Sequence, residues 1–302
     1  MGTIKRRAFL KAGATAAVAA AMPVARTEAA EAPVSTVVVV HGTDIPKMVE
    51  AGIAKMGGWD RFFQAGKKIA LKPNVAWDRT PEQGSNTHPD IIRAFVLAAE
   101  ARKVKEVLLP ENTCHNERKT FVTSGVKAAL EGTIGKLYRP NAKKDDYVAV
   151  DVPKGKICKQ AKVTRVLIEA DCLVNMPVAK HHGGATLTMS MKNWMGAVDN
   201  ATRQAWHRDG LHQCIADFST FLKPTLVVID ATRILLDHGP QGPGKLAHPH
   251  EIIFATDPVA ADTYAATLFG KTPDDVPHVK MAAELGVGCA DLAKIKVERV
   301  EV

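Results

Sequence analysis

Two adjacent histidines, His181 and His182, lie in a short segment that is rich in side chains able to bind ligands. The segment spans 180–199, reads KHHGGATLTMSMKNWMGAVD, and also holds Lys180, Lys192 and Asn193. Histidine suits proton transfer near neutral pH and metal ligation, and lysine can neutralise a carboxylate or a phosphate. We therefore expect this segment to form the floor of a binding or catalytic site.

The two histidines differ in the direction that each side chain can take. If the segment is extended, neighbouring side chains point to opposite faces, so one of His181 and His182 faces the site. The pattern favours neither of them. Gly183 and Gly184 follow and allow a sharp turn of the backbone. We predict that His181 or His182 acts as an acid, a base or a metal ligand, with Lys192 in the same catalytic group.

Polar side chains also follow a predicted strand in the N-terminal half of the chain. Lys72 and Asn74 come directly after the apolar run at 67–71. In open α/β sheets, ligands collect beyond the carboxyl ends of the strands. We therefore predict that Lys72 and Asn74 bind an anionic substrate together with Lys180 and Asn193, on the rim that holds the histidines.

Two aspartates follow predicted strands in the C-terminal half. Asp230 comes after the run at 226–229, and Asp257 after the run at 251–255. We predict that both lie on the same rim and either bind a metal ion or orient the catalytic histidine. Since Asp257 precedes Pro258, it is equally well suited to cap the N-terminus of a helix.

Other metal-binding patterns are weaker. His207 and His212 lie five positions apart on a predicted helix, unlike the i, i+4 pairs of metalloprotease helices, and His248 and His250 flank a proline. No CxxC pair occurs among the five cysteines, which are Cys114, Cys158, Cys172, Cys214 and Cys289. An iron–sulfur cluster or a cysteine-held zinc ion therefore has no support. The cofactor is unknown, with a metal ion as one option.

Several catalytic motifs are absent from the sequence. The run HGPQGPGK at 238–245 differs from the phosphate loop GxxxxGK[ST], because Leu246 takes the position of the hydroxyl residue. Neither GxGxxG nor GxSxG occurs. These absences argue against a nucleotide-dependent kinase, a dinucleotide dehydrogenase and a serine hydrolase.

Apolar periodicity predicts strands that alternate with helices. We expect strands at 34–40, 67–71, 104–109, 147–152, 163–168, 171–176, 226–229, 251–255 and 295–302. We expect helices at 44–56, from 89 onward, and at 119–130, 188–198, 207–222, 257–268 and 276–285. The alternation indicates a three-layer α/β fold, with a mostly parallel sheet covered by helices on both faces. We expect residues 31–302 to form a single domain.

The first thirty residues read as an export signal rather than as part of the fold. Arg6 and Arg7 form a twin-arginine pair, and an uncharged alanine-rich stretch of about fourteen residues follows at 12–25. The stretch is too short and too weakly apolar to span a bilayer. We expect residues 1–30 to be a signal peptide that the twin-arginine export machinery recognises, and the protein to be periplasmic or otherwise exported without a stable membrane span.

The charge of the remaining chain is mildly positive. The whole sequence has a formal net charge of +8, and residues 1–31 hold five basic and two acidic residues, which leaves +5 for the rest. No dense basic run with interleaved aromatic residues occurs. Nucleic acid is therefore not an expected partner, whereas a small anionic molecule is.

Several motifs together resemble those of the domain of unknown function 362 family. The matching elements are Lys72-Pro73-Asn74, Thr87-His88-Pro89, Asn175 to Lys180 with a following histidine, TMSMKNWMG at 188–196, Asp230 with the GPxGPG loop, and DPVAAD at 257–262. The resemblance covers nearly the whole chain after the signal but implies no settled activity. Some members are described as iron–sulfur proteins because they carry a ferredoxin-like cysteine motif, which this chain lacks.

Two functions of different classes fit these features. The first is an exported enzyme that acts on a small anionic substrate, with metal assistance as one option. A distant similarity to the nickel-pincer lactate racemase is conceivable, although no motif supports it. The second is a non-catalytic protein of the cell envelope that binds a metal ion or a small ligand. Turnover of hydroxy acids or phosphates would separate the two.

Overall fold

The fold is taken from a computed structural model, which describes residues 35–141 and 144–302. The predicted signal peptide at 1–30 lies outside the described residues. The described residues form one compact unit. All statements below concern the described residues.

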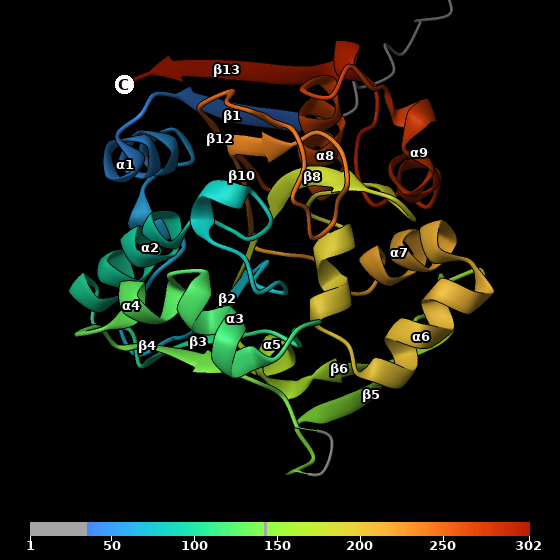
Figure 1. The fold of residues 1–302 in the computed structure, drawn as a ribbon, viewed down its shortest axis with the longest axis horizontal. Helices are drawn as coiled ribbons and strands as arrows, with labels where there is room; N and C mark the ends of the chain where they lie inside the picture. Colours follow the sequence, from blue (N-terminus) through green and yellow to red (C-terminus); the bar gives the residue numbers. More distant parts are fainter. Residues whose placement is uncertain (1–34, 142–143) are drawn as a thin grey trace, which may run out of the picture. The chain divides into compact units, whose positions relative to one another are not determined.

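A large sheet runs through this unit (Figure 1). Its strands are β1 (Ser35–His41), β2 (Lys68–Pro73), β3 (Glu106–Pro110), β4 (Gly135–Tyr138), β7 (Cys172–Met176), β8 (Val178–His182), β9 (Thr186–Thr188), β10 (Leu226–Leu235), β11 (Leu246–Ala247), β12 (Glu251–Ala255) and β13 (Ile295–Glu301). The main path has the order β13-β1-β12-β10-β7-β2-β3-β4, and β8, β9 and β11 extend it from β10. A separate hairpin joins β5 (Tyr147–Asp151) to β6 (Gln160–Thr164).

The sheet is mostly parallel, as predicted. Parallel pairing joins β10, β7, β2, β3 and β4 in turn, and it also joins β8 to β10 and β1 to β13. Strand β12 is the exception on the main path, because it runs antiparallel to both of its neighbours, β1 and β10. The carboxyl end of β12 therefore lies at the opposite edge of the sheet from the carboxyl ends of β2, β3, β8 and β10.

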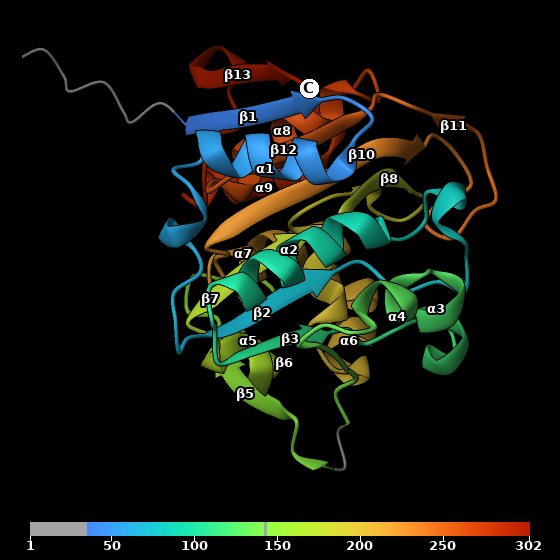
Figure 2. The same cartoon turned by 90° about the vertical axis from the view of Figure 1, so that its left-hand side faces the viewer.

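Helices cover both faces of the sheet. They are α1 (Ile45–Lys55), α2 (Pro89–Ala101), α3 (Glu117–Thr123), α4 (Val126–Leu130), α5 (Arg165–Glu169), α6 (Asn200–Asp209), α7 (Leu211–Ser219), α8 (Pro258–Thr267) and α9 (Pro277–Glu284). Figure 2 shows α1 and α2 in front of the strands. The valines of β1 alternate between two hydrophobic cores, one beneath α1, α2 and α4 and the other beneath α6 to α9. The three-layer α/β prediction is confirmed.

Two predicted helices are each broken at a glycine. The helix expected at 119–130 is divided at Gly125 (φ +75°), and the helix expected at 207–222 is divided at Gly210 (φ +140°). Both values of φ lie in the region that side chains other than glycine rarely adopt. The apolar periodicity correctly predicts helical structure on both sides of each glycine. It does not show the change of chain direction that the glycine permits.

Three other boundaries differ from the prediction. The strand expected at 163–168 is wrong, because the β5 pairing ends at Thr164 and the chain turns into α5. The helix expected at 188–198 is a short 3-10 turn, Lys192–Gly196, because Thr188 still belongs to the ladder between β8 and β9. Strand β10 continues to Leu235, so Asp230 lies within a strand rather than after one.

Candidate active site

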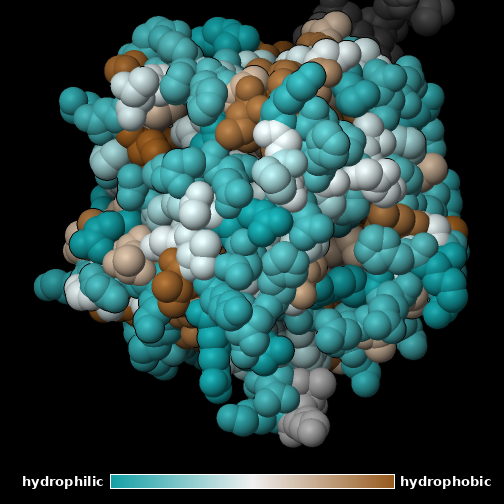
Figure 3. Space-filling view, in the orientation of Figure 1, coloured by the Kyte–Doolittle hydropathy of each residue, from teal (hydrophilic) through white to brown (hydrophobic). Residues whose placement is uncertain are grey.

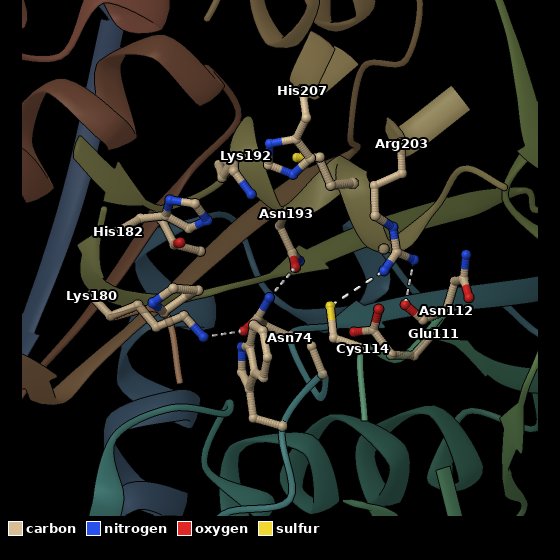
Figure 4. A pocket seen from close by; sticks show the side chains of 16 residues that line it. Asn74, Glu111, Asn112, Cys114, Lys180, His182, Lys192, Asn193, Arg203 and His207 are labelled. Atoms are coloured by element: carbon tan, nitrogen blue, oxygen red, sulfur yellow. Dashed lines mark hydrogen bonds between the residues drawn. The ribbon is translucent and has the colours of Figure 1, made fainter. Parts of the chain in front are cut away.

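A cavity of about 260 Å³ lies beyond the carboxyl ends of β2, β3 and β8. Figure 4 shows polar side chains that converge on it from these strands, from the 3-10 turn and from α6. It is lined by Asn74, Ala76, Trp77, Glu111, Asn112, Cys114, Lys180, His182, Thr188, Lys192, Asn193, Met195, Gly196, Arg203, His207 and Pro240. The volume lies slightly below the ~300–1,000 Å³ of pockets for drug-sized ligands, which indicates a small molecule.

Lys180 is buried at one side of the cavity, where no carboxylate of the described residues forms an ion pair with it. Its side chain is 1% exposed, and its Nζ donates to Asn74 Oδ1 at 2.8 Å and to the Ser85 carbonyl. Burial, reinforced by the nearby Lys192 ammonium, lowers the pKa of Lys180 to about 7. Near neutral pH this amine can therefore both accept and release a proton.

Lys192 reaches the cavity from the 3-10 turn. It is 8% exposed, and no hydrogen bond or ion pair involves its ammonium among the described residues. Burial lowers the pKa of Lys192 to about 8. A buried ammonium without a partner is costly, so an anion bound in the cavity would offset its desolvation.

Lys72 has a different environment from the other two lysines. Its fully buried Nζ lies 3.0 Å from Glu111 Oε2, which also accepts from the Val75 N–H at 2.8 Å. Burial lowers the pKa of Lys72 although Glu111 opposes the shift. Because Glu111 already balances it, Lys72 supports the wall of the cavity and is less available to an anion than Lys180 or Lys192.

The alternation expected for the two histidines is present in β8. His182 lines the cavity, whereas His181 is turned toward the loop at 238–245 and its Nδ1 accepts from the Gly239 N–H at 3.1 Å. Of the two histidines, His182 is the one that lines the cavity. The predicted catalytic role of His181 has no cavity contact to support it.

His182 is held as a neutral ring with a defined tautomer. Its Nδ1 accepts the N–H groups of Gly184 and Ala185, each at 3.0 Å, so the proton of the neutral ring lies on Nε2. Burial, together with Lys192 and Lys180, lowers the pKa of His182 to about 2. No residue in the described part of the chain pairs with Nε2, which makes His182 a hydrogen-bond donor to a ligand rather than a base.

A chain of amides fixes the floor of the cavity. Asn74 Nδ2 donates to Asn193 Oδ1 at 3.0 Å, and Asn193 Nδ2 donates to Asn175 Oδ1 at 2.8 Å. Asn175 in turn donates to the Ser190 carbonyl at 2.8 Å. These bonds place Asn74 Oδ1 toward Lys180, so Asn74 and Asn193, predicted as substrate ligands, are seen here to position Lys180.

Asp262 of α8 anchors the segment that carries Lys192. Its buried carboxylate accepts the N–H groups of Ser190 and Met191 at 2.7 and 3.1 Å. Burial raises the pKa of Asp262 to about 7, against the effect of these hydrogen bonds. The DPVAAD motif therefore supports the cavity from outside, because its Asp262 fixes the backbone directly before the 3-10 turn that carries Lys192.

Sequence analysis did not assign Arg203, Cys114 or His207 to this site, although it named His207 as a weak candidate for a metal ligand. Arg203 Nη2 donates to the Asn112 carbonyl at 2.6 Å, and Arg203 Nη1 lies 3.3 Å from the Cys114 Sγ (Figure 4). His207 lies one turn further along α6, and burial lowers its pKa, with Lys192 adding to the effect. The one available signal was position, because α6 directly follows the TMSMKNWMG motif.

The two aspartates predicted as metal ligands lie elsewhere. Asp230 is fully buried and accepts from Arg233, from the His88 N–H at 2.8 Å and from the Thr232 hydroxyl at 2.7 Å. Burial would raise the pKa of Asp230, but Arg233 and these hydrogen bonds outweigh it and the pKa is lowered. With the Thr232 N–H as a further donor, its two oxygens accept four hydrogen bonds, and Asp230 is not among the residues that line the cavity.

Asp257 caps α8 at the opposite edge of the sheet. It accepts from the Val259 and Ala260 N–H groups at 2.9 and 3.0 Å, and from the Ser35 hydroxyl at 2.6 Å. Because β12 is antiparallel, its end lies beside the first residue of β1. The prediction that Asp257 shares the rim with Lys72, Lys180 and Asp230 is wrong.

The described residues do not provide a metal site. Within 35–141 and 144–302, no group of three or more His, Cys, Asp and Glu side chains is placed to hold a metal ion. The lining includes the amines of Lys180 and Lys192, the guanidinium of Arg203 and the Nε2–H of His182, which suit an anion. Among the described residues, the predicted metal ion therefore has no group of three such donors to support it.

No helix in the described ranges is long and apolar enough to cross a bilayer. The face in Figure 3 is mostly hydrophilic, with hydrophobic residues in small, separate groups.

Comparison with known proteins gives three findings. Residues 69–267 match the family described as domain of unknown function (DUF362). A thylakoid-associated protein of Synechocystis sp. is 21% identical over 247 residues, which are 77% of this chain and 72% of that protein. The lactate racemase apoprotein from Thermoanaerobacterium thermosaccharolyticum aligns with a TM-score of 0.47 and 11% identity over 76% of this chain and 56% of its own length.

Proposed function

The chain belongs to the DUF362 family, and we propose that it is an enzyme that binds a small organic anion in the cavity and uses Lys180 as a proton acceptor. The observation that carries the proposal is the pair of buried lysines, Lys180 and Lys192, which face one cavity without a carboxylate partner. In most proteins a buried charge is paired. Here we expect the anionic substrate to supply the negative charge that would balance Lys180 and Lys192.

The hydrogen bonds of Lys180 suit proton transfer. A neutral amine has two N–H groups, which match its two acceptors, Asn74 Oδ1 and the Ser85 carbonyl. Both bonds are kept when the lone pair accepts a third proton. The protonation state can therefore change without the loss of a buried hydrogen bond, as a general base requires.

The same bonds argue against an imine at Lys180. A protonated imine has only one N–H, so either Asn74 Oδ1 or the Ser85 carbonyl would lose its donor in a buried site. An unpaired buried acceptor costs about 1–3 kcal/mol. Proton transfer is thus the better use of this amine.

Lys192 and Arg203 would hold the negative charge of the substrate. Their cationic groups border the cavity beside Lys180 and are not balanced by the one nearby carboxylate, Glu111, which is engaged with Lys72. An anion that binds between them would stabilise the ammonium form of Lys192 and raise the pKa of that amine.

A non-catalytic binding protein is the second candidate. It is favoured by Lys192, Arg203 and the Nε2–H of His182, which are cations or hydrogen-bond donors and would serve anion binding alone. A metal-binding version of this role lacks a donor set, as described above.

Export through the twin-arginine route is a further part of the proposal. It rests on the sequence at 1–30, in which Arg6 and Arg7 precede the alanine-rich stretch. If it is correct, replacement of both arginines by lysine retains the protein inside the cell, as cell fractionation would measure.

Calorimetry of anion binding tests the main proposal. The full chain is titrated at pH 8 with acetate, pyruvate, lactate and inorganic phosphate, in buffers that differ in ionisation enthalpy. We expect binding of at least one anion with net proton uptake, because the anion raises the pKa of Lys192, which is about 8 in the free protein, while Lys180 stays neutral to act as the base. Lys192→Met should weaken binding at least tenfold, whereas Lys119→Met, which changes an exposed lysine of α3, should not.

Two results would decide against the enzyme. Absence of binding by every anion contradicts both candidate functions. Binding without chemical change of any ligand, followed by NMR, supports the non-catalytic protein instead.

A further inference from the structure

We propose that the substrate is a small oxo acid, whose carbonyl oxygen accepts a hydrogen bond from His182 Nε2 while Lys180 removes a proton from the adjacent carbon. This inference rests on the proposed function and assigns its substrate class and its first chemical step. Three groups carry it: the tautomer of His182, the free position on the Lys180 amine, and the cations at Lys192 and Arg203.

The first group, His182, cannot act as a proton donor in the usual sense. It is neutral, and loss of its Nε2 proton would leave an imidazolate. It can donate a hydrogen bond, and it does so without competing for the proton that Lys180 handles. Such a donor stabilises an oxygen on which negative charge develops. A carbonyl oxygen gains this charge when an adjacent C–H group is deprotonated.

The environment of His182 keeps it in this form throughout the reaction. Two backbone N–H groups hold Nδ1, so the ring cannot turn over without breaking both bonds. The neighbouring lysines oppose a positive charge on the ring. A carboxylate alone would not need this arrangement, because Lys192 and Arg203 already supply positive charge to it. A substrate that also carries a carbonyl oxygen, which is neutral at first and becomes negative on deprotonation, would use His182 as well as Lys192 and Arg203.

The electrons and protons of the step balance without any further reactant. The lone pair of Lys180 takes the proton from carbon, and the pair of electrons of the C–H bond forms a carbon–carbon double bond. The π electrons of the carbonyl move onto oxygen, where His182 Nε2–H donates to the enolate. Lys180 becomes an ammonium ion and returns a proton to carbon in the reverse direction.

The cavity also limits the size of the acid. Its volume of about 260 Å³ and its cationic lining suit an acid of a few carbons. Trp77, Met195 and Ala76 supply the apolar part of the lining, against which a short carbon chain can pack.

Hydrogen–deuterium exchange at carbon tests the inference. The full chain is incubated in D₂O near neutral pD with pyruvate and 2-oxobutanoate, and with lactate and propanoate as acids that lack the carbonyl. We expect loss of the proton signal next to the carbonyl, followed by ¹H NMR, for the oxo acids alone. The rate should exceed that with Lys180→Met at least a hundredfold, and Lys119→Met should match the unaltered chain.

The role of His182 is tested by two substitutions. His182→Leu removes the N–H donor, and we expect a roughly 10²–10³-fold lower exchange rate, as for the loss of one oxyanion donor. His182→Gln keeps an amide N–H and should restore part of the rate. Anion binding by both variants, measured by calorimetry, shows whether they remain folded.

Each outcome bears on a different claim. Exchange of lactate or propanoate, but of no oxo acid, overturns the substrate class and leaves the proposed enzyme standing. Oxo acids that bind without exchange overturn the inference, and exchange that is unchanged in Lys180→Met overturns the assignment of the base. If no acid binds at all, the proposed function fails as well.

Discussion

Two regions of the protein bury charged side chains, and they differ in whether the charge is balanced by a partner. Around Asp230, four donors surround one carboxylate, among them the guanidinium of Arg233. In the cavity, neither Lys180 nor Lys192 forms an ion pair with a carboxylate of the described residues, since Glu111 is paired with Lys72. A saturated buried charge holds parts of the chain together, whereas an unsaturated one is available to a ligand.

The two regions are connected through one loop. Arg233 donates to the carbonyls of Pro81 at 2.8 Å and Asn86 at 2.7 Å, which fixes the loop that supplies the Ser85 carbonyl to Lys180. Asp230 is therefore a positioning residue, although it lies outside the cavity. The comparison shows that a strong carboxylate signal in the sequence can mark the support of a site instead of its chemistry.

The largest expected effect comes from breaking the saturated region. Asp230→Asn leaves Arg233 buried without a counter-charge, and we expect the free energy of unfolding to fall by about 3–5 kcal/mol. Urea unfolding measures the change. Asp274→Asn makes the same chemical change in an exposed ion pair with Lys280, and it should cost no more than about 1 kcal/mol. Equal losses in the two variants would contradict the assigned role of Asp230.

Much of the fold could be predicted from the sequence because its signals are local. The β-branched run of β1 and the Pro-capped starts of α2 and α8 identify elements without tertiary information. The direction of β12 could not be predicted, since only its neighbours in the sheet decide it. That one reversal moved Asp257 from the expected rim to the opposite edge.

The candidate site was predicted in part, for a similar reason. Lys180, Lys192 and His182 stand in one segment, so their proximity followed from the sequence. Arg203 and Cys114 come from elements that meet only in the folded chain, and neither lies at a predicted strand end. The roles also depended on partners: Glu111 balances Lys72, and no sequence pattern shows that Lys192 has no such partner.

A second prediction concerns the unsaturated region and is of intermediate size. The pKa of Lys180 is about 7 in the folded protein, against 10.5 for an unperturbed lysine, so between these values the unfolded chain binds the extra proton. Stability therefore rises with pH in this window, by about 1.4 kcal/mol per pH unit for this group. Burial of the charged amine destabilises the fold fully below pH 7, and this effect disappears as the pH increases.

The substitution Lys180→Met removes this dependence. From pH 7.5 to pH 9.5 the unaltered chain should gain about 2–3 kcal/mol of unfolding free energy relative to the variant. Urea unfolding at the two pH values measures it, with Lys119→Met as the matched control. The same pH dependence in all three proteins would show that Lys180 keeps an ordinary pKa and that the cavity holds no poised amine.

The smallest expected effect on stability comes from Asp257, which lies at the sheet edge opposite the cavity. Asp257→Ala removes the N-cap of α8 and should lower the free energy of unfolding by about 1 kcal/mol. Asp44→Ala removes the corresponding cap of α1 and should cost a similar amount. Because Asp257 bonds only to backbone and Ser35 at its own edge, the affinity of the cavity for anions should not change, as calorimetry would show. A tenfold loss of affinity in Asp257→Ala, but not in Asp44→Ala, would contradict this expectation. It would mean that loss of the cap shifts α8, and with it Asp262, which holds the backbone before the turn that carries Lys192.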